Sequence, residues 1–154
     1  FKEKRDIQKR VVFMIHGLFL FCCSTYDLNI LRTSPTVQNS EFENFVMTIS
    51  VAYFIYDIVI LKMNNLLESS MLLHHVIASI GYYFCCCNNL CAYQAFMTMF
   101  CLECSNFPMH LRAILRYLGL RHSKLYEISE ATFIGTYLWF RMVKYTTFVT
   151  GQFF

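Results

Sequence analysis

Long apolar stretches and short polar segments alternate along the whole chain. A helix that crosses a membrane needs about 20 mainly apolar residues. Stretches near this length run over residues 11–26, 45–61, 71–87, 90–107 and 128–149. The second and third are apolar nearly all round, whereas a surface helix of a soluble protein keeps a polar face. We therefore expect an all-α, multi-pass bundle with at least five spanning helices.

The segments between these stretches carry residues that favour turns and helix ends. Residues 24–44 are polar and contain Pro35, and Asn88-Asn89 suits a tight turn. Residues 111–124 are amphipathic and basic, and Gly119 among them favours the end of a helix. We expect these segments to connect the helices at the two membrane surfaces.

The composition also points to a membrane protein. Hydrophobic residues make up 56% of the chain and charged residues 15%, whereas soluble domains carry about 25% charged residues. The net charge of +3 is too small to indicate nucleic-acid binding. The chain starts with Phe and stops inside an apolar stretch, so we expect a longer natural protein with a further span after Phe154. We assign residues 1–10 to an N-terminal segment and 11–154 to a truncated transmembrane domain.

Positive charges predict the orientation of the bundle, because loops rich in Lys and Arg stay in the cytoplasm. With the N-terminal segment inside, the cytoplasmic side carries Lys2, Lys4, Arg5, Lys9, Arg10, Lys62, Arg112, Arg116, Arg121 and Lys124. The outer loops carry only Arg32. We therefore predict that the N-terminal segment is cytoplasmic and that residues 24–44 are lumenal or extracellular.

A few ionisable side chains fall inside the apolar stretches, where such groups are costly and usually face the bundle interior. They are His16, Asp57, His74, His75, Glu103, Arg141 and Lys144. The first five lie at similar depths in the cytoplasmic half of four different helices. We expect His16, Asp57, one of the two adjacent histidines and Glu103 to converge on one polar cavity that opens toward the cytoplasm.

The adjacent histidines could carry chemistry. Neighbouring residues on a helix point about 100° apart, so one histidine would face the cavity and the other would pack elsewhere. Histidine suits proton transfer near neutral pH, and Asp57 could hold its tautomer as in a catalytic triad. We therefore name His74, His75 and Asp57 as candidate catalytic residues. The alternative is that the histidines only join helices by hydrogen bonds.

Glu103, Asn106 and His110 share one helix face, at positions i, i+3 and i+7. Together with the adjacent histidines they could hold a metal ion. The chain contains no Glu-x-x-His pair of the kind that di-iron sites use, and we predict no metal and no cofactor. The 8 cysteines show no paired zinc spacing, and their redox state stays open.

Tyr137, Arg141 and Lys144 share a face of the last helix, at i, i+4 and i+7. Arg141 could bind a lipid head group or pair with an acid. If the helix has other bounds, both cations lie at a membrane surface instead. The candidate lipid-binding residues are His16, Glu103, Asn106 and Arg141.

Four segments follow one another in a specific order. Residues 9–16 begin with Lys9-Arg10 and end in His16, and residues 52–57 are an aromatic stretch that ends in Asp. Leu72-Leu73-His74-His75 carries the adjacent histidines, and residues 103–112 read Glu-Cys-Ser-Asn-Phe-Pro-Met-His-Leu-Arg. These segments resemble the motifs of the TLC-domain membrane proteins, the family that includes the ceramide synthases. The segment of residues 103–112 resembles the Glu-x-Ser-x-Pro-Phe-x-x-x-Arg segment of the non-synthase branch of this family.

The resemblance implies a multi-pass fold, a role in lipid homeostasis and a location in the endoplasmic reticulum, with the plasma membrane as the alternative. Ceramide synthases carry His-Asp-x-x-Asp where this chain has Leu102-Glu103-Cys104-Ser105-Asn106. The resemblance therefore does not imply N-acylation of sphingosine.

Three hypotheses for the function stay open. The first is a lipid-homeostasis protein that binds a membrane lipid or acyl chain in the cytoplasm-facing cavity. The second is a ceramide synthase-like acyltransferase that uses the His74-His75 pair and acyl-CoA. The third is a non-catalytic trafficking or translocation factor. The departure at residues 102–106 favours the first over the second, and the histidines with Asp57 favour either of these over the third. The lipid and the oligomeric state do not follow from the sequence.

Overall fold

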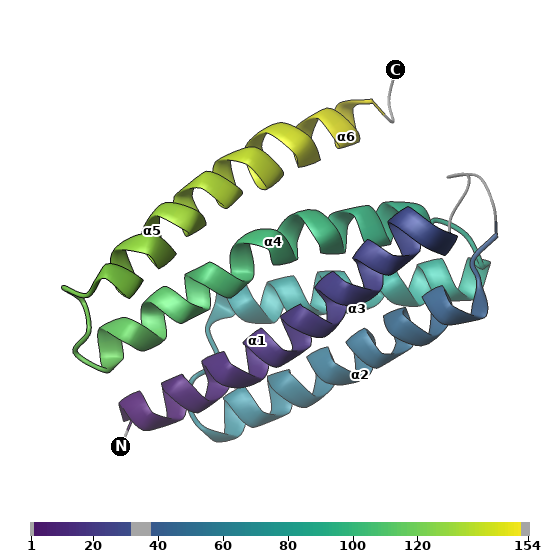
Figure 1. The fold of residues 1–154 in the computed structure, drawn as a ribbon. Helices are drawn as coiled ribbons and strands as arrows, with labels where there is room; N and C mark the ends of the chain where they lie inside the picture. The colour runs from purple at the N-terminus through teal and green to yellow at the C-terminus, as the bar shows by residue number, and fades with distance from the viewer. Residues whose placement is uncertain (1, 32–37, 152–154) are drawn as a thin grey trace. The chain divides into compact units, whose positions relative to one another are not determined.

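The structure is a computed structural model that describes residues 2–31 and 38–151. Every regular element in these ranges is helical, which confirms the all-α prediction (Figure 1). In chain order the elements are α1 (Lys2–Tyr26), η1 (Asp27–Leu31), α2 (Glu41–Met63), α3 (Ser69–Asn88), α4 (Ala92–Tyr117), α5 (Lys124–Thr136), η2 (Tyr137–Tyr145) and α6 (Thr146–Thr150). Both η elements are π-helices. Arg32 and Pro35 of the predicted outer loop lie outside the described residues.

Three described helical segments are long and apolar enough to cross a membrane. They are Lys4–Leu31, Glu41–Met63 and Ser69–Asn88, and they correspond to the first three predicted spans. Only 6% of the most apolar part of α3 is buried within the chain. Its apolar side chains are therefore free to face lipid, as membrane helices require.

The fourth and fifth predicted spans correspond to α4 and to the continuous run α5–η2–α6. Neither is among the three described segments that are long and apolar enough to cross a membrane. In α4 the apolar residues alternate with polar and charged ones such as Glu103, Arg112 and Arg116, which lowers the mean hydropathy. Membrane crossing by these two helices stays a prediction.

Two helices extend further than hydropathy predicts. α1 begins at Lys2, because Lys, Glu and Arg are good helix formers even outside an apolar stretch. α4 runs on to Tyr117 although it contains Pro108. A proline inside a helix removes one backbone hydrogen bond, but α4 continues past it. α4 ends before Gly119, whose φ of 75° suits glycine, as the sequence predicts.

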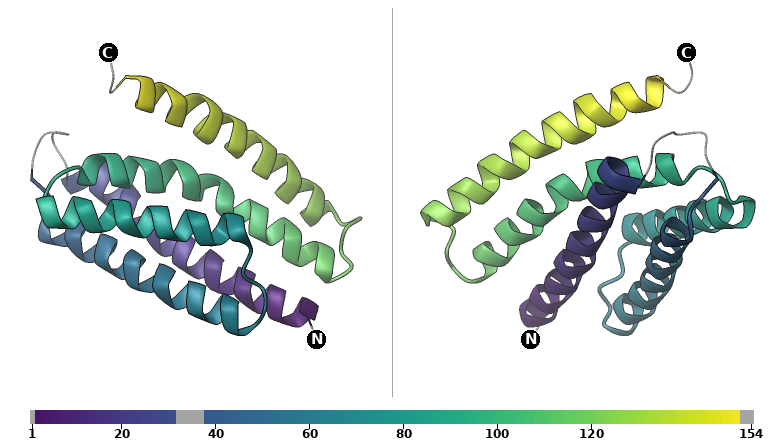
Figure 2. Two further views of the ribbon diagram at one scale, coloured as in Figure 1. Left: turned by 180° about the vertical axis from the view of Figure 1, so that it is seen from behind. Right: turned by 45° about the vertical axis from the view of Figure 1, so that its right-hand side comes forward.

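The described chain forms two compact units. Unit 1 comprises Phe1–Tyr26 with Met97–Phe154, and unit 2 comprises Asp27–Phe96. In unit 2, α2 and α3 lie side by side as an antiparallel hairpin (Figures 1 and 2). α2 starts with a capping box, in which Ser40 Oγ accepts from the Glu43 N–H and the Glu43 carboxylate accepts from the Ser40 N–H.

An asparagine cluster ties the start of α2 to the end of α3 in unit 2. Asn39 donates its side-chain N–H to the Cys85 carbonyl at 2.9 Å and to Asn44 Oδ1 at 3.1 Å. Its Oδ1 accepts from the Ala92 N–H at 3.0 Å. Asn44 donates to Asn89 Oδ1 at 3.0 Å. Because Asn39 is buried, its removal would leave several partners without water to replace it.

Replacing Asn39 by Ala is expected to lower the free energy of unfolding by about 2 kcal/mol, because buried donors and acceptors lose their partner. Thermal unfolding of the full chain in detergent micelles measures this change. Asn88→Ala is the matched control, because Asn88 is exposed and donates within its own helix to the Phe84 carbonyl. It should change stability by less than about 0.5 kcal/mol. Equal losses of stability in the two variants would show that the hydrogen bonds of Asn39 do not stabilise the contact between α2 and α3.

In unit 1, α5–η2–α6 runs back along α4 after the turn at Gly119 (Figure 2). Arg112 of α4 pairs with Glu130 of α5 at 3.1 Å and lies over the Phe133 ring. Phe21 of α1 stacks on Phe100 of α4, with ring centroids 5.6 Å apart. These contacts bring α1, α4 and α5 together around the polar face of α4.

Candidate functional site

A hydrogen-bond network in unit 1 joins the last helix to α4. Arg141 of η2 donates from Nε to Ser105 Oγ at 2.8 Å and from Nη2 to the Leu102 carbonyl at 3.2 Å. Nη2 also donates to Asn106 Oδ1. Asn106 in turn donates to Glu103 Oε2 at 2.9 Å. The network thus links a cation to a carboxylate through one amide side chain. Arg141 lies in a π-helix, a rare element that is frequent at functional sites.

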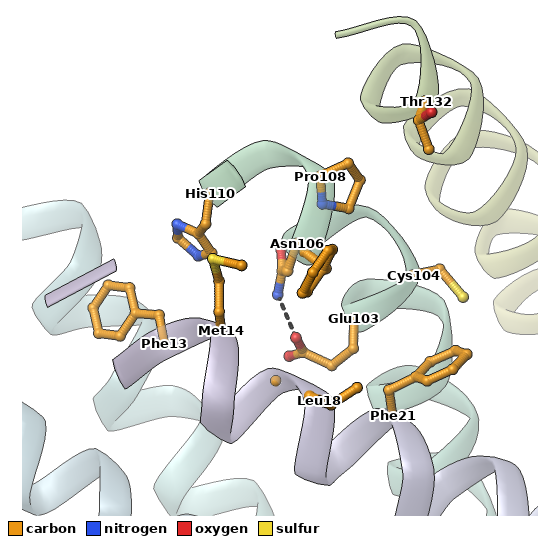
Figure 3. Close-up of a pocket in the computed structure, with 12 residues that line it drawn as sticks. Phe13, Met14, Leu18, Phe21, Glu103, Cys104, Asn106, Pro108, His110 and Thr132 are labelled. Carbon is orange, nitrogen blue, oxygen red and sulfur yellow. Dashed lines mark hydrogen bonds between the residues drawn. The ribbon is translucent and has the colours of Figure 1, made fainter. Parts of the chain in front are cut away.

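A cavity of about 330 Å³ lies beside this network, and we call it the α1–α4 pocket (Figure 3). Its lining is mainly apolar, with a few polar groups that come mostly from α4. The lining residues are Phe13, Met14, Gly17, Leu18, Phe21, Glu103, Cys104, Asn106, Phe107, Pro108, His110 and Thr132. Ligand pockets typically enclose about 300–1,000 Å³ and combine an apolar wall with a few polar groups. The α1–α4 pocket has this character.

Gly17 allows the Glu103 carboxylate to approach the backbone of α1. A Cβ atom at residue 17 would lie 2.5 Å from Glu103 Oε2, so the end of the Glu103 side chain would have to shift to make room for it. A glycine inside a helix costs about 1 kcal/mol relative to alanine, so this close approach gives a physical reason for glycine at this position. Figure 3 shows the carboxylate between α1 and Asn106.

His110 lies two turns beyond Glu103 on the same face of α4. It is 9% exposed, and its Nδ1 has no hydrogen-bond partner in the described part of the chain. Its ring centroid lies 5.4 Å from that of Phe13. Burial, reinforced by the positive charges of Arg10 and Lys9, lowers the pKa of His110 to about 4. With this lowered pKa, the His110 imidazole is neutral at physiological pH. His110 lies beyond the fourth predicted span.

Unit 2 contains a second polar feature, a buried histidine–aspartate pair. His75 Nε2 of α3 lies 2.7 Å from Asp57 Oδ2 of α2. Both residues are buried, and Phe54 stacks on the His75 ring with centroids 4.9 Å apart. His75 Nδ1 is also buried and has no hydrogen-bond partner among the described residues. His74 is exposed, so the adjacent histidines occupy different environments.

The predicted site residues fall into both units. Unit 1 holds His16 and Glu103, and His16 lies next to Gly17 on α1. Unit 2 holds Asp57 and His75, which contact each other directly. Convergence of all these groups on one cavity stays a prediction.

Sequence reasoning missed the apolar wall of the α1–α4 pocket. Met14, Leu18 and Phe21 appear in the sequence as ordinary apolar residues of a membrane helix, although they share a face at i, i+4 and i+7. The one usable signal is Gly17 in their midst, since it marks a close approach on that face. Ser105, which accepts from Arg141, was also missed, because the rotation of each helix about its axis was unknown.

All eight cysteines lie among the described residues, and all are free thiols. In the described ranges, no three His, Cys, Asp or Glu side chains come close enough together to hold a metal ion.

An all-helical chain with three helices long and apolar enough to cross a bilayer is an integral membrane protein. Its sequence matches the family model of the TLC domain over residues 6–154. The chain belongs to the TLC domain family, and the recognition of that family from its four motifs is confirmed.

TLC domain-containing protein 2 of Danio rerio is 30% identical to this chain over 105 residues. The aligned region covers 68% of this chain and 43% of that relative. The chain therefore matches less than half of the relative's length. No solved structure matches the chain.

Proposed function

We propose that this TLC-domain protein acts in lipid homeostasis by holding a membrane lipid or acyl chain in the α1–α4 pocket. The observation that carries the proposal is the apolar wall of α1 facing the polar groups of Glu103 and Asn106. Arg141, bonded to Asn106, supplies a positive charge that makes a buried carboxylate tolerable beside an apolar cavity.

The proposal includes the predicted topology. The pocket opens toward the cytoplasm, and at least five helices cross the membrane, of the endoplasmic reticulum or alternatively the plasma membrane. The Lys and Arg residues grouped near one end of the predicted spans support this orientation. His16, Asp57 and the adjacent histidines belong to the same cytoplasmic half of the bundle in this proposal.

Replacing Leu18 by Trp is expected to abolish retention of lipid while leaving protein abundance unchanged. Leu18 lines the pocket, and it is 53% exposed, so the larger side chain fills the cavity without overpacking a core. Native mass spectrometry of the purified full chain measures the lipid that copurifies with each variant.

Ile15→Trp is the matched control. Ile15 lies on the same helix and is 65% exposed, but it is not among the residues that line the pocket. This variant should retain lipid like the wild type. If Leu18→Trp also retains lipid at the wild-type level, the pocket is not the binding site.

A second candidate function is acyl transfer from acyl-CoA, and the contact between His75 and Asp57 favours it. Asp57 accepts a hydrogen bond from Nε2, which leaves Nδ1 as a base. His75 would take the proton of an attacking amine or hydroxyl as that nucleophile bonds to the thioester carbon. The C–S bond then breaks, and His75 returns the proton to the CoA thiolate. Release of free CoA thiol on mixing acyl-CoA with lipid extract tests this reaction.

A further inference from the structure

The α1–α4 pocket contains a buried polar atom that the protein leaves without a partner. His110 lines the pocket, is 9% exposed, and bonds through Nδ1 to nothing in the described residues. Leaving such an atom unpaired is destabilising, so a ligand that supplies the missing hydrogen bond gains affinity. Figure 3 shows His110 and Glu103 on the same side of α4, with Asn106 between them.

Arg141, the cation of this region, is not among the residues that line the pocket. Arg141 uses Nε and Nη2 to donate to Ser105, the Leu102 carbonyl and Asn106. Asn106 lies between Arg141 and Glu103, and Glu103 lines the pocket. An anionic head group in the pocket would therefore meet a carboxylate first and would be repelled.

A hydroxyl group complements both polar ends of the pocket. It donates to the Glu103 carboxylate, and it either donates to or accepts from His110 Nδ1, whichever tautomer is present. A fully ionised phosphate only accepts, so it does not pair with the Glu103 carboxylate, and an ammonium only donates, so it pairs with His110 Nδ1 in one tautomer only. Residues i and i+7 are about 10 Å apart along a helix, so a head group with more than one hydroxyl serves both ends best.

We propose that the α1–α4 pocket binds an uncharged, single-chain amphiphile with a hydroxyl-bearing head, of the monoacylglycerol type, held by Glu103 and His110. This inference rests on the proposed function, because it names the ligand class of the same pocket. A cavity of about 330 Å³ lies within the roughly 300–1,000 Å³ of ligand pockets, and it accommodates a glycerol head and the first methylenes of one chain. The rest of the chain extends into the bilayer.

Three probes with the same twelve-carbon chain and different heads test the inference on the purified full chain in lipid nanodiscs. They are monolauroylglycerol, dodecyl phosphate and dodecylamine, titrated by native mass spectrometry. Monolauroylglycerol is expected to bind about 10-fold more tightly than dodecyl phosphate, which corresponds to one charge-assisted hydrogen bond. It should also bind more tightly than dodecylamine. The wild-type protein alone decides this point, so the test does not depend on a variant that folds.

Variants locate the effect at the two residues. His110→Phe keeps a ring against Phe13 but removes the nitrogen, so it should weaken the binding of monolauroylglycerol by about 10-fold. Glu103→Gln removes the negative charge and should strengthen the binding of dodecyl phosphate. His122→Phe, at an exposed position, is the matched control and should change neither affinity.

The outcomes separate this inference from the proposed function. If dodecyl phosphate or dodecylamine binds most tightly, and Leu18→Trp blocks it, the pocket binds lipid but the head-group class is wrong. If Leu18→Trp blocks none of the three probes, the proposed function fails as well. Equal affinities for all three probes in the wild type would also overturn the head-group assignment.

Discussion

Replacing His75 by Ala is expected to lower the free energy of unfolding by about 3 kcal/mol and to reduce the amount of protein in the membrane. Asp57, which is 4% exposed, would lose the imidazole nitrogen that lies 2.7 Å from its carboxylate. A buried charge without a partner is strongly destabilising. Phe54 would also lose the ring stacked on it. Thermal unfolding in detergent micelles and quantitative immunoblotting of membranes measure the two effects.

His74→Ala is the matched control for this experiment. The two residues are adjacent and chemically identical, but His74 is exposed. Its replacement should change stability by less than about 0.5 kcal/mol. A loss for His74→Ala as large as that for His75→Ala would contradict the assignment of the buried pair to His75 and Asp57.

A double variant separates the structural role of this pair from a catalytic one. Apolar residues of similar volume often replace a buried ion pair without loss of stability, so Asp57→Leu with His75→Leu should regain most of the stability lost in His75→Ala. Acyl transfer that depends on His75 would not return. A wild-type lipid profile in cells that carry the double variant would exclude the acyltransferase and leave the pair as a structural contact.

Arg141→Met is expected to lower the free energy of unfolding by about 3 kcal/mol, because a hydrogen bond to a charged group contributes roughly 1.5–3 kcal/mol. The substitution removes the donors to Ser105 Oγ, the Leu102 carbonyl and Asn106. The Glu103 carboxylate, bonded to Asn106, would lose its compensating charge. Thermal unfolding measures the loss, and native mass spectrometry of the same samples measures lipid retention.

Two further variants show whether the geometry of the guanidinium matters. Arg141→Lys keeps the charge but lacks the planar fork that reaches several acceptors at once, so it should recover less than half of the loss. Lys144→Met is the matched control, because Lys144 is exposed on the next turn and lies over the Phe100 ring at 5.9 Å. If Lys144→Met lowers the free energy of unfolding as much as Arg141→Met does, the network around Asn106 is not what holds η2 to α4.

The family and the helical class could be predicted from the sequence. The helical class depends on local apolar runs, and the family depends on motifs that follow one another in a specific order. Apolar runs near the length of a bilayer crossing predicted the first three spans. Asn89 and Gly119, predicted at a turn and at a helix end, follow α3 and α4 with positive φ values. The four motifs predicted the TLC domain, which the family match over residues 6–154 confirms. These features do not depend on which helix packs against which.

The pairing of the polar groups depended on tertiary structure. The sequence placed His75 and Asp57 at similar depths and left open which of the adjacent histidines faces the aspartate. In an apolar helix such as α3, hydropathy is nearly uniform around the axis, so the sequence does not encode which side faces a neighbouring helix. The packing of α3 against α2 selects His75 for the contact and leaves His74 exposed.

The same reason explains the α1–α4 pocket. The sequence by itself determined the helices, the depth of Glu103 along α4 and the common face of Glu103, Asn106 and His110, because these follow from hydropathy and from the helical repeat. Only the tertiary structure decided that Arg141 bonds to Asn106 and that Gly17 lies against Glu103. Such contacts require the rotation and approach of two helices, which shape complementarity between side chains far apart in the sequence determines.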